Sequence, residues 1–320
     1  MNKIVFDLEW NQSPKGKEYS NKHLPFEIIE IGAVKLNNEN EIVDRFQCLI
    51  RPKVYTWIHS NIHEVIHLNY RELKKGLPFE QAANEFFEWC GPEHQFYVWG
   101  DQDIKELQRN LKFYGMLDLM PGPIVYYDVQ KLYTIQCEGK KAMRALESAV
   151  ETFRIPHEME FHRALADAYY TALVLQKLKP ELVSTMTSID VYQNPKSKRE
   201  EIHLSYPKYD KYISREFLTK EKALRDREVC STKCPKCKKP AKRTIRWFMN
   251  NGKTGYSVSV CTEHGLVKGK NRVRKTEEGK YYIVKTLKLI NETEAGEIRE
   301  KREHVRMKRK QNRQKINKDK

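Results

Sequence analysis

The feature that most constrains this chain is a short apolar run near its N-terminus that carries two carboxylates. Ile4 to Phe6 form a continuous β-branched and aromatic stretch, which predicts a buried strand because it is too short for a helix. Side chains alternate along a strand, so Asp7 and Glu9 are expected on one face at its end. Like charges held side by side repel, and a divalent metal ion is the first candidate for their partner. An acidic strand end in solvent is the alternative.

More carboxylates and a histidine follow in the first half of the chain. Asp103 opens a helical pattern after a short strand at 96–99, where a carboxylate also caps free backbone amides. His162 and Asp167 bracket the start of a helix expected over 163–178. Asp167 is the more informative of the two, because a buried unpaired charge in an Ala- and Leu-rich helix is costly.

The pattern of the first 180 residues predicts an α/β domain. Strands expected over 26–36 and 41–50 follow the first strand so closely that the three must pair antiparallel. Beyond them, strands at 96–99 and 123–126 alternate with helical patterns such as 79–90. We therefore expect a mixed five-stranded sheet flanked by helices.

The order of these motifs resembles a known enzyme family. D-x-E on a first strand, an Asp opening the helix after the fourth strand and H-x4-D on a late helix are similar to the DEDDh (DnaQ-like) 3′-to-5′ exonucleases of the ribonuclease-H-like fold. The resemblance covers about residues 1–180. Two stretches, W-G-D-Q-D at 99–103 and G-x-P-F-x2-A-x3-F at 76–86, resemble the KapD and histone-mRNA exonuclease branch.

The resemblance implies roles for five residues. It implies that Asp7, Glu9, Asp103 and Asp167 hold two Mg²⁺ or Mn²⁺ ions and that His162 is the general base. Phosphodiester hydrolysis fits these residue types, because paired divalent ions help to activate water and stabilise the developing charge. Four carboxylates suit Mg²⁺, and imidazole is a suitable base near neutral pH.

Two departures from the family pattern stand next to these residues. Many members have Thr after D-x-E, whereas this chain has Trp10, which predicts stacking or apolar wedging against the terminal nucleotide. Asp101 competes with Asp103 for the third acidic role. Asp103 is favoured because Leu107 and Leu111 follow it at helical spacing and match the family register.

Charge is distributed unevenly along the 320 residues. Residues 1–180 contain 22 Lys and Arg against 25 Asp and Glu, whereas residues 181–320 contain 37 against 18. A strongly basic C-terminal part predicts a polyanionic partner, nucleic acid before membrane, with a solubilising tail as the alternative. The chain shows no signal-peptide pattern and no run of about 18 apolar residues, which predicts a cytoplasmic protein with no membrane partner. The seven cysteines do not resemble a disulfide framework, which fits a reducing compartment.

Four parts are expected along the chain. They are an exonuclease domain over 1–180, a polar and helical connector over 181–229, a basic module over 230–290 and a basic tail over 291–320. The connector is expected to hold a helix over 215–228, and the tail to be solvated or helical.

The basic module contains two paired metal-ligand motifs. Cys234-Pro-Lys-Cys237 and Cys261-Thr-Glu-His264 have the spacing of a structural zinc site of the zinc-ribbon kind. A segment too small for its own core makes metal a natural source of folding energy. Coincidental reduced cysteines are the alternative reading, and Cys230 is an alternative ligand.

Three regularly spaced histidines could suggest a further metal site. His59, His63 and His67 repeat at four-residue intervals, which places them on one side of a helix. No carboxylate partner accompanies them, so partly exposed histidines are the simpler interpretation.

Basic and aromatic residues near the cysteines predict nucleic-acid binding. Lys242, Arg243 and Arg246 suit phosphate, and Trp247 suits base stacking, as does Trp10 in the first domain. The sequence therefore predicts a metal-dependent 3′-to-5′ exonuclease acting on single-stranded nucleic acid, with RNA favoured over DNA by the branch resemblance. A nucleic-acid-binding regulatory protein and a small-oligonucleotide hydrolase are the alternatives.

Overall fold

The computed structural model describes residues 1–57, 70–138 and 143–318. Its chain divides into two compact units, Met1–Gln193 and Asn194–Lys320, and each is described here by itself. The histidines at 59, 63 and 67 lie outside the described residues. Within the described ranges, no helix combines the length and the apolar character needed to cross a membrane.

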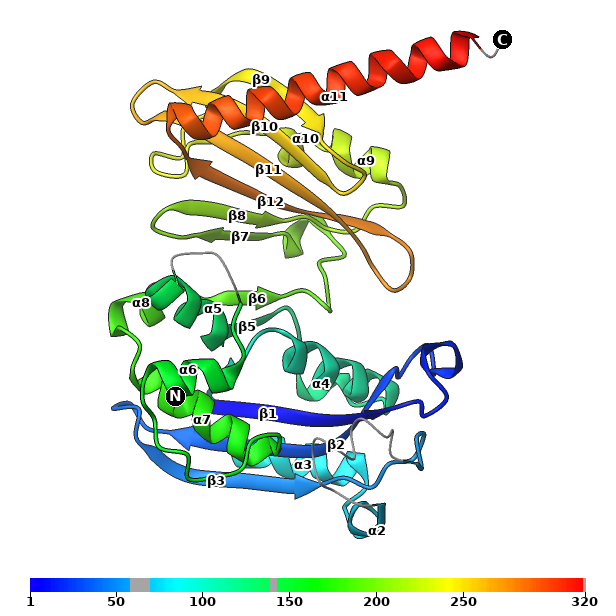
Figure 1. Ribbon diagram of the computed structural model, residues 1–320, viewed down its shortest axis with the longest axis vertical. Coiled ribbons are helices and arrows are strands. Elements are labelled where there is room, and N and C mark those ends of the chain that lie inside the picture. Colours follow the sequence, from blue (N-terminus) through cyan, green and yellow to red (C-terminus); the bar gives the residue numbers. More distant parts are fainter. Residues whose placement is uncertain (58–69, 139–142, 319–320) are drawn as a thin grey trace. The chain divides into compact units, whose positions relative to one another are not determined.

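The first unit is built on a six-stranded mixed sheet in the order β3-β2-β1-β4-β5-β6 (Figure 1). The strands β1 (Asn2–Gln12), β2 (Phe26–Leu36) and β3 (Ile42–Leu49) pair antiparallel. The strands β4 (His94–Val98) and β5 (Ile124–Asp128) continue the sheet in parallel with β1, and β6 (Ser188–Asp190) closes it antiparallel to β5.

Helices cover both faces of this sheet. The unit contains α2 (Tyr70–Leu73), α3 (Phe79–Cys90), α4 (Gln102–Phe113), α5 (Val129–Tyr133), α6 (Leu146–Thr152), α7 (Ala164–Gln176) and α8 (Pro180–Thr185). Apolar side chains of α3 and α4 pack on one face of β1, and those of α5, α6 and α7 pack in a second core with Val5 and Val34.

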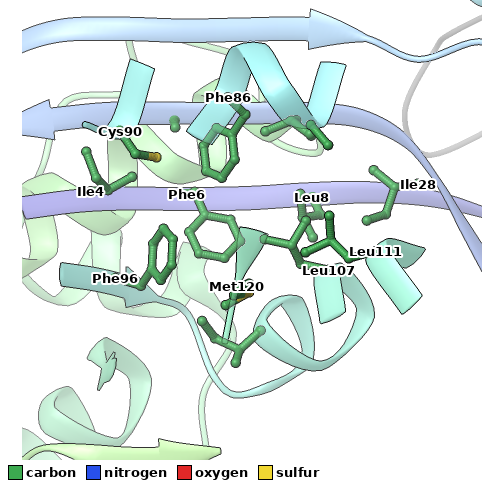
Figure 2. Packing of buried hydrophobic residues seen from close by; sticks show 14 of the residues in the cluster. Ile4, Phe6, Leu8, Ile28, Phe86, Cys90, Phe96, Leu107, Leu111 and Met120 are labelled. Carbon is green, nitrogen blue, oxygen red and sulfur yellow. The ribbon is translucent and has the colours of Figure 1, made fainter. Parts of the chain in front are cut away.

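Alternation along β1 sorts its side chains between these two cores. Ile4, Phe6 and Leu8 point into the α3–α4 core, where the Phe6 ring lies 5.7 Å from Phe86 and 5.1 Å from Phe96 between centroids (Figure 2). Both contacts are edge-on, the arrangement that aromatic quadrupoles favour. The residues between them in the sequence, including the two carboxylates, therefore belong to the opposite, α7 side of the sheet.

The expected α/β fold with a mixed sheet is confirmed, with one strand more than predicted. The additional strand, β6, lies beyond residue 180, so the first compact unit extends to Gln193. A three-residue edge strand carries too few residues for a visible alternating pattern, which explains why the sequence did not indicate it.

The second unit is a six-stranded antiparallel sheet in the order β7-β8-β12-β11-β10-β9. Its strands are β7 (Ile202–Ser205), β8 (Tyr209–Ile213), β9 (Lys242–Met249), β10 (Thr254–Cys261), β11 (Gly265–Lys275) and β12 (Tyr281–Leu289). The short helices α9 (Lys220–Arg225) and α10 (Arg227–Cys230) pack on one face, and the long α11 (Glu292–Lys318) crosses the other (Figure 1).

Two expected parts of the C-terminal half differ in the structure. The segment expected to be a connector supplies β7 and β8, because β8 pairs with β12 along five residue pairs and so joins the module's sheet. The helix expected over 215–228 is split into α9 and α10 at Asp226, whose side chain caps α10. The tail is the helix α11, anchored by the buried Ala295 and Ile298.

Candidate active site and cysteine cluster

Three carboxylates from two elements meet on the α7 side of the first sheet. Asp7 and Glu9 come from β1 and Asp167 from α7, and ligand oxygens of the three lie within 4.8 Å of one another. The helix can approach this closely because Gly32, which pairs with Asp7 in the sheet, lies directly against the backbone of Ala164 and Leu165. The expectation that Asp7 and Glu9 share a face agrees with this arrangement.

Asp103 and Asp101 lie in different environments at the start of α4. Asp103 is only 4% exposed, and its charge acts on the carboxyls of Asp7 and Glu9. Asp101 is exposed and forms an ion pair with Lys105 one turn along the helix. Of the two, only Asp103 is placed to complete an acidic site with Asp7.

His162 sits at the entrance to α7 in a left-handed backbone conformation, with φ of 64°. Its backbone N–H donates to Asp167 Oδ1 at 3.3 Å, and its Nε2 lies 3.4 Å from Glu147 Oε1 of α6. The imidazole is about half exposed, with 54% of its side-chain surface accessible. The histidine is thus tied to one carboxylate by its backbone while its ring stays open to solvent.

Burial and mutual repulsion raise the pKa of every acid in this cluster. Burial is the largest cause at each acid, and neighbouring negative charges add to it. The pKa of Asp7 is raised well above its usual range, that of Glu9 to about 9, that of Asp103 to about 7 and that of Asp167 to about 6. Four carboxyls that resist joint ionisation are a donor set that fits hard divalent cations.

Glu30 and Arg163 support the site and were not singled out from the sequence. Glu30 on β2 is fully buried, and Arg163 donates to both of its carboxylate oxygens at 2.8 and 3.1 Å. Gln47 donates to the same carboxylate at 2.7 Å. The bidentate ion pair of Arg163 with Glu30 links β2 to the residue that precedes α7. The available signal was that Glu30 stands between Ile29 and Ile31 in a strand pattern.

The cluster predicts how the Mg²⁺-free protein responds to pH. The pKa of Glu9 rises from 4.5 to about 9 on folding, so the stability linked to its proton is present below pH 4.5 and lost as pH rises toward 9. We expect Glu9→Gln to be more thermostable than the wild type in Mg²⁺-free buffer, by a margin that grows over this range. Adding Mg²⁺ at pH 8 should stabilise the wild type and not the variant.

Thermal unfolding midpoints at a series of pH values, with and without Mg²⁺, measure both effects. Glu39→Gln, which removes an exposed carboxylate, is the matched control and should follow the wild type. A pH-independent difference between Glu9→Gln and the wild type would contradict the prediction.

Trp10 lies half-buried beside Phe26, with ring centroids 6.0 Å apart, and packs against the α3–α4 core. Its indole is therefore held by an aromatic neighbour next to Glu9. Contact of Trp10 with the terminal nucleotide stays a prediction, because the indole packs on the α3–α4 side of the sheet and the carboxylates lie on the α7 side.

The second unit contains the expected cysteine cluster. Cys234 and Cys237 lie in a turn before β9, and Cys261 and His264 lie at the β10–β11 turn, with all four ligand atoms within 4.8 Å of one another. Cys237 Sγ is 3.6 Å from Cys261 Sγ, and the latter is 3.7 Å from His264 Nδ1. Burial would raise the pKa of the Cys261 thiol, but hydrogen bonds from Glu263 and His264 lower it to about 6. The set fits a tetrahedral zinc ion.

Cys230, the alternative ligand, points elsewhere. Its thiol donates to the Leu224 carbonyl oxygen at 2.9 Å and does not join the four-residue cluster. Sequence spacing could not separate it from the ligands, because it lies only four residues before Cys234.

The residues of β9 that are expected to bind nucleic acid differ in their exposure to solvent. Lys242, Arg243 and Arg246 are exposed. Trp247 is half-buried instead, because its indole N–H donates to the Cys230 carbonyl at 3.0 Å and its ring lies over Gly269. This packing covers part of the Trp247 ring, and stacking of Trp247 on a base stays a prediction.

The mixed sheet and its flanking helices have the expected ribonuclease-H-like fold. The exonuclease family model RNase T matches residues 4–175, more than half of the chain, so the chain belongs to this exonuclease family. The expected enzyme class, an exonuclease, is thereby confirmed.

Several solved structures are similar to this chain at low sequence identity. The nuclease domain of 3′hExo, a DEDDh family member bound to rAMP, is 18% identical with a TM-score of 0.50 and covers 59% of this chain and 96% of its own. A 3′-exonuclease in 3′-end-specific recognition of the histone mRNA stem-loop is 15% identical, with a TM-score of 0.49. The match covers 61% of this chain and 92% of that exonuclease. E. coli exonuclease I in complex with a dA16 oligonucleotide is 11% identical, with a TM-score of 0.49. The match covers 85% of this chain and 54% of exonuclease I. Among curated protein sequences, none matches the chain.

Proposed function

We propose that the protein removes nucleotides from the 3′ end of single-stranded nucleic acid with the help of two divalent metal ions. The meeting of Asp7, Glu9 and Asp167 beside the buried Asp103 is the observation that carries the proposal. Asp7, Glu9, Asp103 and Asp167 would hold two Mg²⁺ or Mn²⁺ ions. When bound, such ions help to generate hydroxide and stabilise negative charge on the phosphate and the leaving 3′ oxygen.

The protein's own residues would manage the proton. His162 is the general base: its exposed imidazole accepts a proton from water as the water oxygen attacks phosphorus and the bond to the 3′ oxygen breaks. The products are a nucleoside 5′-monophosphate and a strand shortened by one residue. Glu147 Oε1, 3.4 Å from His162 Nε2, is placed to orient the imidazole.

RNA is the preferred substrate in this proposal. Support comes from the resemblance of the 76–86 and 99–103 stretches to the KapD and histone-mRNA exonuclease branch. A regulatory nucleic-acid-binding role and small-oligonucleotide hydrolysis are the competing functions. A cytoplasmic location stays a prediction from cysteine usage.

Digestion of end-labelled RNA and DNA oligonucleotides with Mg²⁺ or Mn²⁺ tests the proposal. The 5′-labelled strand should give a ladder of progressively shorter products, and the 3′-labelled strand should release labelled mononucleotide first. His162→Ala should slow the reaction about 10²- to 10⁴-fold, the scale of general-base catalysis, and Asp7→Ala should stop it. Absence of a ladder would favour the regulatory role, and turnover of only the shortest oligonucleotides would favour the small-oligonucleotide hydrolase.

The cysteine cluster is proposed as a structural zinc site. We expect purified wild-type protein to contain one zinc ion per chain and Cys234→Ser to contain none. The second unit of the variant should also no longer unfold in a cooperative transition. Cys230→Ser is the matched control and should retain zinc, because its thiol lies outside the cluster. Metal analysis by mass spectrometry measures the content. Equal zinc in Cys234→Ser and the wild type would disprove the site.

A further inference from the structure

The second sheet presents a row of cations on one of its faces. Burial alternates along β11: Val267, Gly269 and Asn271 are buried, whereas Lys268, Lys270 and Arg272 between them are not. Val273, two residues further in the buried series, packs with α9 and α10, whereas Leu266 packs with α11. The cations alternate in step with Leu266, so they lie on the α11 face, about 6.7 Å apart along the strand.

Neighbouring elements extend this charge. Lys288 of β12 pairs directly with Lys268 in the sheet, and Tyr256 of β10 pairs with Lys270. Lys301 of α11 also reaches this point, because its ammonium lies 5.5 Å from the Tyr256 ring centroid, and that of Lys268 lies 5.9 Å from it. We call Tyr256, Lys268, Lys270, Arg272, Lys288 and Lys301 the basic face.

The basic face is only partly neutralised from within the protein. Lys288 pairs with Glu294 at 3.1 Å, and the charges of Glu294 and Glu297 act on Lys268. Among the residues that the structure describes, no carboxylate lies within ion-pair distance of Lys268, Lys270, Arg272 or Lys301. Burial and the neighbouring cations both lower the pKa of Lys270, a sign that these groups repel one another.

The C-terminal half of α11 continues the same charge away from its anchor. Residues 304–318 contain seven Lys and Arg and no Asp or Glu, whereas the first half of the helix, where Ala295 and Ile298 are buried, carries five Glu. Acidic residues are thus confined to the part of the helix that packs on the sheet.

We propose that the basic face binds the phosphodiester backbone of a single-stranded nucleic acid, an inference that rests on the exonuclease function proposed above. Cations repeating along one strand can track successive phosphates, and a phosphate at the Tyr256 position would meet the ammonium groups of Lys268 and Lys301 together. Binding releases counterions and relieves the repulsion within the face. This places the main contact on β10, β11 and α11, and not on Trp247 of β9.

The test compares two triple variants of the full chain with equal charge. Lys268→Gln/Lys270→Gln/Arg272→Gln removes the β11 row. Lys222→Gln/Arg225→Gln/Arg227→Gln removes three exposed cations from α9 and α10 on the other side of the same sheet. Fluorescence anisotropy with a long labelled single strand, without added divalent ion, gives Kd, and thermal midpoints and zinc content verify that both variants fold. Lys301→Gln, on an element outside the sheet, supplies an independent single variant.

We expect the β11 triple to raise Kd about 30- to 100-fold and to make the log–log salt dependence shallower by about 2. Lys301→Gln should raise Kd severalfold, and the α9–α10 triple should stay near the wild type. Equal weakening by the two triples, or loss of binding to phosphatidylserine vesicles without loss of oligonucleotide binding, would overturn the proposal.

Cleavage separates this inference from the proposed function. Turnover of a dinucleotide should be unchanged in the β11 triple, while KM for the long strand rises. If neither the wild type nor any variant produces a cleavage ladder, but the β11 triple binds the strand more weakly, the exonuclease proposal is wrong and the proposed basic face is supported. If the ladder forms and Kd is unchanged in the β11 triple, the binding face fails alone.

Discussion

Asp103→Asn is expected to lower the rate of 3′-end cleavage by about 10²- to 10³-fold, the scale of losing one preorganised charge contact in the transition state. Asp103 is 4% exposed, and its charge acts on both carboxylates of β1. Asparagine keeps the size of the side chain but removes the negative charge that a divalent ion requires. The loss should therefore appear in kcat as well as in the Mg²⁺ concentration needed for half-maximal activity.

Asp101→Asn is the matched control, because it makes the same chemical change two residues away. Asp101 is exposed and pairs with Lys105 at the helix surface, where such pairs contribute about 0.2–1 kcal/mol. We expect this variant to cleave within about twofold of the wild-type rate. Rates from single-turnover digestion of a labelled strand distinguish the two. A larger defect in Asp101→Asn than in Asp103→Asn would reverse the assignment of the third acidic residue.

Much of the acidic site could be predicted from the sequence because it depends on local periodicity. Strand alternation places Asp7 and Glu9 on one face. The roles of Asp103, His162 and Asp167 were implied by the resemblance of the motif order to the DEDDh exonucleases. The spacing of Cys234, Cys237, Cys261 and His264 likewise reports two tight turns. Each motif needs only the conformation of a few neighbouring residues.

The parts that the sequence did not indicate depend on contacts between distant segments. Glu30 and Arg163 are 133 residues apart, and their ion pair follows from the pairing of β2 and the path of the chain into α7. The contact of His162 with Glu147 depends on how α6 packs against α7. Tyr256 and Lys301 meet only because α11 folds back across the second sheet.

The connector was mispredicted for a related reason. The strands β7 and β8 are only four and five residues long. The alternation of Ile202 and Leu204 with polar residues in β7 is too short to stand out, and β8 shows none. Hydrogen bonding to β12 stabilises them as part of a sheet. Long-range pairing therefore overrode a weak local preference, as it commonly does in β-structure.

Gly32 decides whether the two halves of the acidic site can meet. It pairs with Asp7 in the β1–β2 register, and a Cβ placed on it would lie 2.0 Å from Leu165 N and 2.1 Å from Ala164 C. These are backbone atoms of the first turn of α7, which cannot rotate away as a side chain would. A glycine within a strand is typical of such a close backbone approach. The position of Asp167 relative to Asp7 and Glu9 therefore depends on the missing side chain.

Gly32→Ala is accordingly expected to destabilise the first unit by about 2–4 kcal/mol, because the clash forces α7 away from β2. The displacement carries Asp167 and the His162 backbone with it, so cleavage should fall about 10²-fold in the folded fraction, the scale of misplacing a reacting group by about 1 Å. Denaturant unfolding measures the first effect, and digestion kinetics below the unfolding transition measure the second. Gly252→Ala, with no atom within 4 Å of the added Cβ, is the control and should leave both unchanged. Wild-type stability and cleavage in Gly32→Ala would show that α7 has room to spare, and that the acids are brought together by the Glu30–Arg163 pair instead.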